Sequence, residues 1–262
     1  MKRLSFATLF VAIVALLGSC QKPATVEVVA LQDNLQPRLM QAALFAETAP
    51  EGLIESLGLQ EGVPASVCAF MVNTQDKQIL FDAGNGNDDS QLLPALTKAG
   101  YTAADIDYVM ITHMHGDHIG GMTRDGKAAF ENATLYIPKA EYDGWIAMGE
   151  ERSAQMRAMI AAYGDRVKIF TASDTLPCDV EAIAAVGHTP GHTAYRVGDV
   201  VIAGDVMHGV ALQLEHPEIC ARFDMDKANA VASRKMLIEK ARTEGLRMYG
   251  MHFPAPYYLD LK

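Results

Sequence analysis

Three histidines and one aspartate lie within six residues of one another and carry the strongest chemical signal in the chain. They are His113, His115, Asp117 and His118, in the sequence Thr-His-Met-His-Gly-Asp-His. The chain has 8 histidines in 262 residues, so three in so short a window are improbable by chance. Because imidazoles and carboxylates are the usual ligands of zinc and similar divalent cations, the segment predicts a metal centre.

The residues around this cluster are those needed to bring its side chains together. Residues 108–111 are apolar and partly β-branched, which predicts a short buried strand that ends just before the histidines. His113 and His115 are two positions apart, so in extended backbone their imidazoles point the same way. Gly116 then permits a sharp turn that brings the aspartate and the third histidine back toward them.

The pattern His-x-His-x-Asp-His resembles the hallmark of the metallo-β-lactamase superfamily of metal-dependent hydrolases. Three further motifs follow in the family's order: Gly-His-Thr-Pro-Gly-His at residues 187–192, Ala-Gly-Asp at 203–205 and Gly-Met-His-Phe-Pro at 250–254. The resemblance covers roughly residues 81–256. It implies an α+β fold, a four-layer αββα sandwich in a single domain, with the site in a cleft at one edge.

The resemblance also implies a set of ligands for two divalent metal ions. One ion would be held by His113, His115 and His192, the other by Asp117, His118 and His252, and Asp205 would bridge the two. Zinc is the expected metal, with manganese, iron or cobalt as alternatives. Such a pair would supply a bridging hydroxide as the nucleophile at neutral pH.

Asp117 and His208 are the candidate catalytic residues. His208 follows the bridging aspartate by three positions, where lactonase-like relatives carry a tyrosine that contacts the substrate. An imidazole there would stabilise the oxyanion that forms during hydrolysis, or alternatively would support a metal ligand from behind. Asp82 is expected either to orient a ligand histidine or to cap a turn. His188 is expected to pack against the site or support it rather than to bind metal.

The aspartate at position 205 argues against β-lactam hydrolysis, because true β-lactamases of the superfamily do not use an aspartate bridge there. The pattern around Asp205 and His208, followed by Arg-Phe-Asp-Met-Asp at 222–226, most resembles the branch with methyl parathion hydrolase-like and lactonase-like enzymes. The expected function is hydrolysis of a small, fairly apolar ester, lactone or phosphotriester. A mononuclear-iron sulfur dioxygenase of the same fold and a thioesterase remain alternatives.

Residues 1–20 have the layout of a bacterial lipoprotein signal peptide. Two basic residues precede an apolar run over residues 6–17, which is too short to span a membrane, and Leu-Gly-Ser-Cys ends at Cys20. We therefore expect an exported protein that faces the periplasm, attached to the membrane only through lipid on Cys20. Gln21 after the cysteine favours the outer membrane, and an ordinary signal peptide is the alternative. The hydrolase domain would occupy residues 25–262.

The formal net charge of −10 and the lack of a basic run argue against nucleic-acid binding, so the expected partner is a small-molecule substrate. Cys68, Cys178 and Cys220 show no metal-binding or disulfide spacing and are expected to be unpaired, with Cys178 in a surface loop. The oligomeric state stays open.

Several methionines and aromatic residues near the metal motifs form either an apolar mouth or part of the core: Met114, Met122, Trp145, Met148, Met207, Met251, Phe253 and Tyr257. Further strands are expected at residues 26–31, 67–72, 78–81, 134–137, 167–170, 180–186, 194–197 and 200–203. Helices are expected at 50–59, 90–99, 138–148, 150–163 and 226–244, with a helical turn at 102–105.

Overall fold

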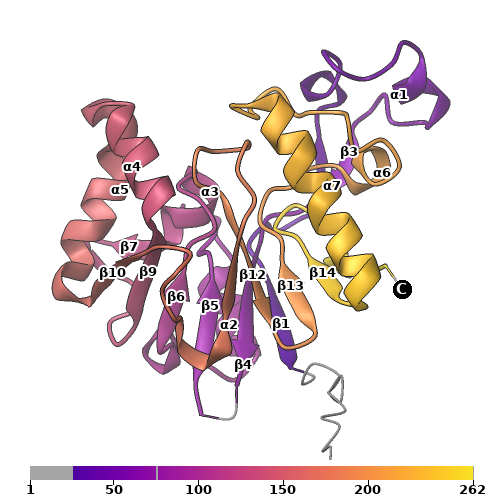
Figure 1. Ribbon diagram of the computed structural model, residues 1–262. Helices are drawn as coiled ribbons and strands as arrows, with labels where there is room; N and C mark the ends of the chain where they lie inside the picture. Colours follow the sequence, from indigo (N-terminus) through magenta and orange to yellow (C-terminus); the bar gives the residue numbers. More distant parts are fainter. Residues whose placement is uncertain (1–25, 75, 262) are drawn as a thin grey trace, which may run out of the picture.

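The computed structural model describes residues 26–74 and 76–261. The predicted signal peptide and Cys20 lie outside these residues. Two β-sheets stack face to face, with α4 and α5 outside one sheet and α7 outside the other (Figure 1). The predicted four-layer αββα sandwich is therefore confirmed.

The first sheet has six strands in the order β1-β4-β5-β6-β9-β10. Its first three strands are antiparallel and the rest run parallel, so the carboxyl ends of β5, β6, β9 and β10 meet at one edge. The strands are β1 (Glu27–Gln32), β4 (Cys68–Asn73), β5 (Gln78–Phe81), β6 (Tyr108–Met110), β9 (Thr134–Pro138) and β10 (Val167–Phe170). All six were predicted to within a residue or two.

The second sheet has five strands in the order β11-β12-β13-β14-β15. They are β11 (Glu181–Ala184), β12 (Thr193–Val197), β13 (Val200–Ile202), β14 (Arg247–Tyr249) and β15 (Tyr258–Asp260). Strands β13 and β14 are parallel and the other neighbours are antiparallel. The last two strands, three residues each, were not predicted.

The helices are α1 (Leu53–Ser56), α2 (Leu92–Lys98), α3 (Gly116–Ile119), α4 (Lys139–Ala147), α5 (Glu150–Tyr163), α6 (Val210–Gln213) and α7 (Lys227–Glu244). Short 3-10 turns are η1 (Ala42–Leu44), η2 (Ala103–Asp105), η3 (Gly120–Met122), η4 (Gly164–Arg166) and η5 (Pro177–Asp179). Helix α7 begins after Asp226, whose side chain accepts a hydrogen bond from Asn229 N–H, and ends at Gly245 in a left-handed conformation. None of the described helices is both long and apolar enough to cross a bilayer.

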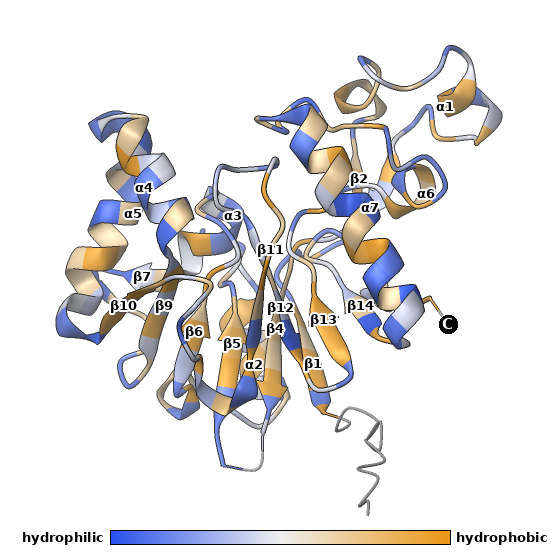
Figure 2. Cartoon of the chain, viewed as in Figure 1, coloured by the Kyte–Doolittle hydropathy of each residue, from blue (hydrophilic) through white to orange (hydrophobic). Residues whose placement is uncertain are grey.

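Alternation along β4 shows why the first sheet is apolar on both faces. Cys68, Phe70 and Val72 pack into the core between the sheets, whereas Ala69 and Met71 pack under the helices. In Figure 2 the central strands are accordingly coloured as largely hydrophobic, while the outer helices carry alternating polar and apolar stripes. The two sheets therefore form a rigid support for the loops at their edge.

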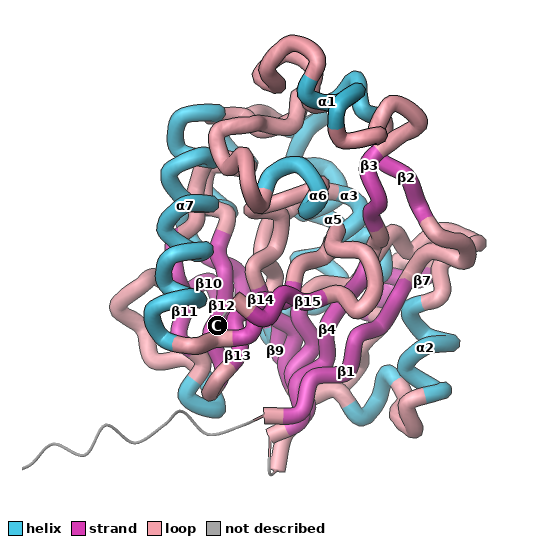
Figure 3. Tube along the Cα trace, turned by 90° about the vertical axis from the view of Figure 1, so that its right-hand side faces the viewer, coloured by secondary structure: helices cyan, strands magenta, loops and turns pink. Residues whose placement is uncertain are grey.

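Residues 38–65 form a small layer over that edge, which we call the strap. It contains the hairpin of β2 (Arg38–Met40) and β3 (Val63–Ala65), and it packs with α6 around a separate apolar cluster. Figure 3 shows the strap above the sheets, beside α6. Another short hairpin joins β7 (Thr123–Arg124) and β8 (Lys127–Ala128). The strap was predicted only as a helix over residues 50–59, of which α1 is the central part.

The cysteines of the described chain are free, as predicted. Cys68 and Cys220 are buried, and Cys178 is half-buried in the turn η5.

Candidate active site

Five segments deliver polar side chains to one end of the sandwich. His113 and His115 follow β6, and Asp117 and His118 lie in the short helix α3 that comes next. Loops after β11, β13 and β14 supply the others, which are His188, Asp205 and His252. The predicted convergence of distant motifs is thus present.

Four of these side chains form a first group. His113, His115, His188 and Asp205 each offer a ligand atom, and these atoms lie within 4.8 Å of one another. His115 Nδ1 is 3.0 Å from His113 Nε2 and 2.9 Å from His188 Nε2. In a tetrahedron with Zn–N bonds of ~2.0–2.1 Å, ligand atoms are ~3.3 Å apart, so these separations fit a zinc-sized ion.

A second group contains Asp117, His118 and His252, whose ligand atoms also lie within 4.8 Å of one another. His252 Nε2 is 3.5 Å from Asp117 Oδ2, and His118 Nε2 is 3.9 Å from Asp117 Oδ1. These residues are the three that were predicted to hold the second metal ion.

The carboxylate of Asp205 lies between the two groups. Its Oδ1 is 3.2 Å from His118 Nε2, whereas its Oδ2 is 3.0 Å from His252 Nε2 and 3.4 Å from His188 Nε2. One carboxylate therefore faces both groups at ligand distances. This is the geometry that a bridging ligand requires.

The electrostatics of the groups fit metal ions. His118 Nε2 and Asp205 Oδ1 are buried and face each other at 3.2 Å, but neither forms a hydrogen bond within the described part of the chain, which is costly for polar atoms unless something else binds them. In the first group, burial lowers the pKa of His113 well below its usual value and that of His115 to about 3, so both imidazoles are neutral. Neutral imidazole is the form that binds a metal. In the second group burial also lowers the pKa of each histidine, but the nearby carboxylates, that of Asp205 foremost, outweigh it and raise the pKa of His118 and His252.

Outer contacts fix the orientation of the histidines. His118 Nδ1 lies 2.7 Å from Asp82 Oδ2, His188 Nδ1 lies 2.9 Å from Asp224 Oδ1, and His252 Nδ1 lies 2.8 Å from the carbonyl oxygen of Ser66. Such carboxylate or carbonyl partners on the far nitrogen are typical of metal-binding histidines. The prediction that Asp82 orients a ligand histidine agrees with this contact, and Asp82 also accepts two hydrogen bonds from Thr112.

The structure corrects the choice of histidine in the Gly-His-Thr-Pro-Gly-His motif. His192 does not join either group; its Nε2 accepts a hydrogen bond from Asp205 N–H at 2.9 Å. A Cβ at position 204 would lie 2.4 Å from that nitrogen, so Gly204 lets the Asp205 loop close over the ring. His188, which was not expected to bind metal, takes the place assigned to His192.

His208 lies against Asp205, with His208 Nε2 3.2 Å from Asp205 Oδ2. It lines the same cavity as the two groups but is fully buried, stacked on the ring of His252 at 5.2 Å. Burial lowers the pKa of His208 to about 4, so its imidazole is neutral. His208 thus lines the cavity and also contacts Asp205 and His252, as expected for the alternative in which it supports metal ligands; its role on the oxyanion stays a prediction.

Glu141 of α4 is a buried residue of the site that the sequence did not reveal. Its Oε1 accepts hydrogen bonds from Met114 N–H at 2.9 Å and Trp145 Nε1–H at 2.6 Å. Its Oε2 accepts from the Thr189 hydroxyl and Gly191 N–H, both at 2.8 Å. Glu141 therefore joins the loop of His113 and His115 to the loop of His188. The four-residue spacing of Glu141 and Trp145 on one helix face was the only sequence signal.

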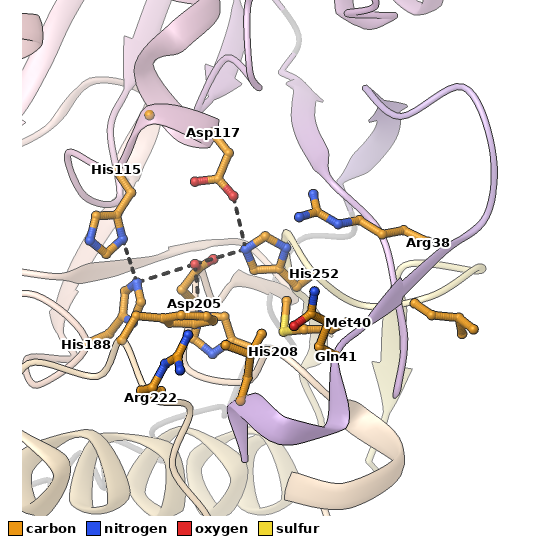
Figure 4. A pocket seen from close by; sticks show the side chains of 14 residues that line it. Arg38, Met40, Gln41, His115, Asp117, His188, Asp205, His208, Arg222 and His252 are labelled. Atoms are coloured by element: carbon orange, nitrogen blue, oxygen red, sulfur yellow. Dashed lines mark hydrogen bonds and ion pairs between the residues drawn. The ribbon is translucent and has the colours of Figure 1, made fainter. Parts of the chain in front are cut away.

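A cavity of about 600 Å³ opens over the two groups. Figure 4 shows the side chains that line it, with Asp205 at the centre. Its walls come from the strap, from α3 and from the segment after α6. The residues that line it are Arg38, Leu39, Met40, Gln41, Leu44, His115, Gly116, Asp117, His188, Asp205, His208, Arg222, Phe223 and His252. The volume is typical of a site for a small organic molecule.

The apolar wall of this cavity comes from residues outside the metal motifs, which agrees with the alternative that the methionines and aromatic residues near those motifs belong to the core. Leu39, Met40, Leu44 and Phe223 form it. None of the eight methionines and aromatic residues proposed for a mouth lines the cavity, and most of them are core residues. They are near the metal motifs in sequence because those motifs follow buried strands.

Comparison with known proteins agrees with the site. Residues 62–240 match the model of the metallo-beta-lactamase superfamily. An N-acyl homoserine lactonase of Bacillus thuringiensis is 26% identical over 206 residues, which cover 68% of this chain and 77% of that protein. A hydroxyacylglutathione hydrolase of Shewanella denitrificans is 31% identical over 102 residues, which cover 39% of this chain and 34% of that protein.

Two solved structures are similar over most of the chain. AidC, described as a dizinc quorum-quenching lactonase in complex with a product, superposes with a TM-score of 0.80 at 26% identity and covers 91% of each chain. The hydrolase AbOPH of the beta lactamase superfamily superposes with a TM-score of 0.78 at 27% identity, covering 90% of this chain and 91% of that one.

Proposed function

The chain belongs to the metallo-β-lactamase superfamily and is a metal-dependent hydrolase, and from this premise we propose that it opens lactones at a pair of divalent metal ions. Zinc is the metal we propose for both positions, because the ligand set consists of imidazoles and carboxylates. The similarity to lactonases extends over at least two thirds of the chain and supports lactones over other esters.

The position of Asp205 carries the proposal of two ions. One ion would be held by His113, His115 and His188, the other by Asp117, His118 and His252, with the Asp205 carboxylate shared. When bound, such ions lower the pKa of water enough to supply hydroxide near neutral pH and polarise the carbonyl that it attacks.

Asp117 and His208 act on the substrate side of this site. The Asp117 side chain is 30% exposed, against 3% for Asp205, so part of its carboxylate is open to the cavity. We propose that this carboxylate accepts the proton of the attacking hydroxyl group and passes it to the alkoxide that leaves when the ring opens. His208 lies on the opposite side of Asp205, where a neutral imidazole can donate a hydrogen bond to the developing oxyanion.

The cavity wall selects the rest of the substrate. Leu39, Met40, Leu44 and Phe223 offer apolar contact for a short acyl chain, and Leu39 is 55% exposed. Burying an acyl chain there contributes about 0.8 kcal/mol per CH₂ group. The strap therefore determines preference among acyl chains.

A panel of substrates tests this proposal. Zinc-loaded protein would be assayed with N-hexanoyl homoserine lactone, a 4-nitrophenyl ester, a dialkyl 4-nitrophenyl phosphate and a glutathione thioester. We expect the highest kcat/KM for the lactone and loss of all activity after chelation. A higher kcat/KM for the thioester would favour a thioesterase, and oxygen uptake with a persulfide in place of hydrolysis would favour a sulfur dioxygenase.

A further inference from the structure

Two arginines lie in the wall of the metal cavity. Arg38 belongs to β2 in the strap, and Arg222 belongs to the segment between α6 and α7. Figure 4 shows them on opposite sides of the histidine and aspartate cluster, each with its guanidinium group directed toward it. Neither arginine is a metal ligand, because guanidinium groups stay protonated in proteins.

Neither guanidinium forms an ion pair within the part of the chain that the structure describes, although other basic side chains do. Arg234 pairs with Asp224, Arg196 pairs with Glu244, and Lys77 pairs with Asp107. The carboxylates that line the cavity are those of Asp117 and Asp205, and both face the imidazoles of the metal groups. Arg38 and Arg222 therefore keep their charges available to a molecule in the cavity.

The two segments that carry these arginines are joined to each other. Arg222 N–H donates to the carbonyl oxygen of Leu44 at 2.8 Å, and the Thr48 hydroxyl bonds with both the carbonyl and the N–H of Cys220. Hydrogen bonds thus join the strap to the segment after α6. These bonds fix the backbone that carries the two arginines, whose side chains are exposed.

The protein as a whole carries a formal net charge of −10, which repels anions. The two arginines in the cavity give this one region a positive charge that can attract an anion. A planar guanidinium group matches the two oxygens of a carboxylate or the oxygens of a phosphate. We propose that Arg38 and Arg222 bind an anionic oxyacid group of the substrate, each from its own side of the cavity.

This inference rests on the proposed function and narrows its substrate class. The apolar side chains of Leu39, Met40, Leu44 and Phe223 line the cavity together with the arginines. A substrate that fits has a hydrolysable ring or ester at the metal groups, a short apolar chain, and a carboxylate or phosphate within reach of the guanidinium groups. A neutral acyl chain would leave both guanidinium groups without a partner.

The kinetic test compares two lactones that differ only at the end of the acyl chain. One is N-hexanoyl homoserine lactone, and the other carries an acyl chain of equal length that ends in a carboxylate. We expect the anionic lactone to have a kcat/KM at least tenfold higher, mainly through a lower KM, and the advantage to shrink in 0.5 M NaCl. Arg38→Gln and Arg222→Gln should each remove most of it, and Arg38→Lys should restore a part.

Arg242→Gln is the matched control, because Arg242 is an exposed arginine of α7 that does not line the cavity. It should leave the ratio between the two lactones unchanged. Equal kcat/KM values for the two lactones in the wild type, or a ratio that both cavity variants leave intact, would overturn the inference.

A binding measurement separates this inference from the proposed function. Calorimetric titration of the zinc-loaded protein with hexanoate and with adipate compares one carboxylate with two on chains of equal length, and a phosphate-terminated analogue distinguishes phosphate from carboxylate. Tighter binding of adipate or the phosphate, lost in Arg38→Gln, supports the anion site even if no lactone is hydrolysed. Equal binding of all three overturns it even if lactones are hydrolysed.

Discussion

Replacement of Glu141 by glutamine tests how the fold holds the site together. The carboxylate is fully buried and accepts four hydrogen bonds, two on each oxygen. Glutamine has one oxygen and one NH₂ group of nearly the same shape. In either orientation the NH₂ group faces two donors, so two hydrogen bonds are lost and two buried donors stay without an acceptor.

The magnitude follows from those two donors. An unsatisfied buried group costs about 1–3 kcal/mol, so Glu141→Gln should lower the free energy of unfolding by about 2–6 kcal/mol. For a domain of this size about 2–4 °C of Tm is lost per kcal/mol, and we expect a fall of about 10 °C in the metal-free protein. Because Glu141 joins the two histidine loops, zinc affinity should also fall about 10- to 100-fold.

Calorimetry of the metal-free protein and competition for zinc with a chelator dye measure both effects. Glu151→Gln provides the control, since Glu151 is an exposed residue near the start of α5. If Glu141→Gln melted within 2 °C of the wild type and bound zinc with unchanged affinity, the proposed link between the loops would be refuted.

Three further predictions concern single residues. His208→Phe should keep its metal content and fold while kcat falls about 100-fold, and unchanged turnover in the metal-loaded variant would exclude a role on the oxyanion. Burial raises the pKa of the Cys68 thiol to about 12, so at pH 8 this thiol is almost wholly protonated. Iodoacetamide should therefore label the half-buried Cys178 at least tenfold faster than Cys68, as followed by mass spectrometry. Faster labelling of Cys68 would contradict the structure. Cys20→Ser should move the protein from the membrane fraction to the soluble fraction with activity intact, and a variant that stayed on membranes after a salt wash would refute the lipoprotein proposal.

Much of the fold was predictable because its strands are apolar and its longer helices have clear ends. Residues 150–163 and 226–244 have helical patterns, and the second begins at a capping aspartate and ends at a glycine. The strap was not predicted because its strands have three residues each and its side chains Leu39 and Leu57 are exposed. Such a segment is stabilised by contacts with α6, which are distant in sequence.

The candidate site was predictable in its residue types and less so in its geometry. The His-x-His-x-Asp-His segment identifies its members locally, because the ligands lie on one strand end and the helix after it. The choice between His188 and His192 depends instead on a hydrogen bond from Asp205 N–H, thirteen residues beyond His192. That contact exists only after β12 and β13 have paired, so the motif alone could not decide it.

The two arginines of the cavity could not be predicted from the sequence for the same reason. Arg38 and Arg222 are far apart in sequence, and neither lies in a metal motif. Only the contact between the strap and the segment after α6 brings them to the same cavity. Local patterns therefore identify the chemistry, whereas the substrate-binding wall requires the folded chain.

Metal analysis of two histidine variants tests the central claim most directly. Wild-type protein, His188→Gln and His192→Gln would be purified in zinc-containing buffer and analysed by plasma mass spectrometry, with circular dichroism to verify folding. We expect close to two zinc ions per chain in the wild type, close to one in His188→Gln, and two in His192→Gln, where the glutamine oxygen can still accept the Asp205 N–H. One iron ion per wild-type chain, or loss of metal in His192→Gln and not in His188→Gln, would contradict the proposed dinuclear site.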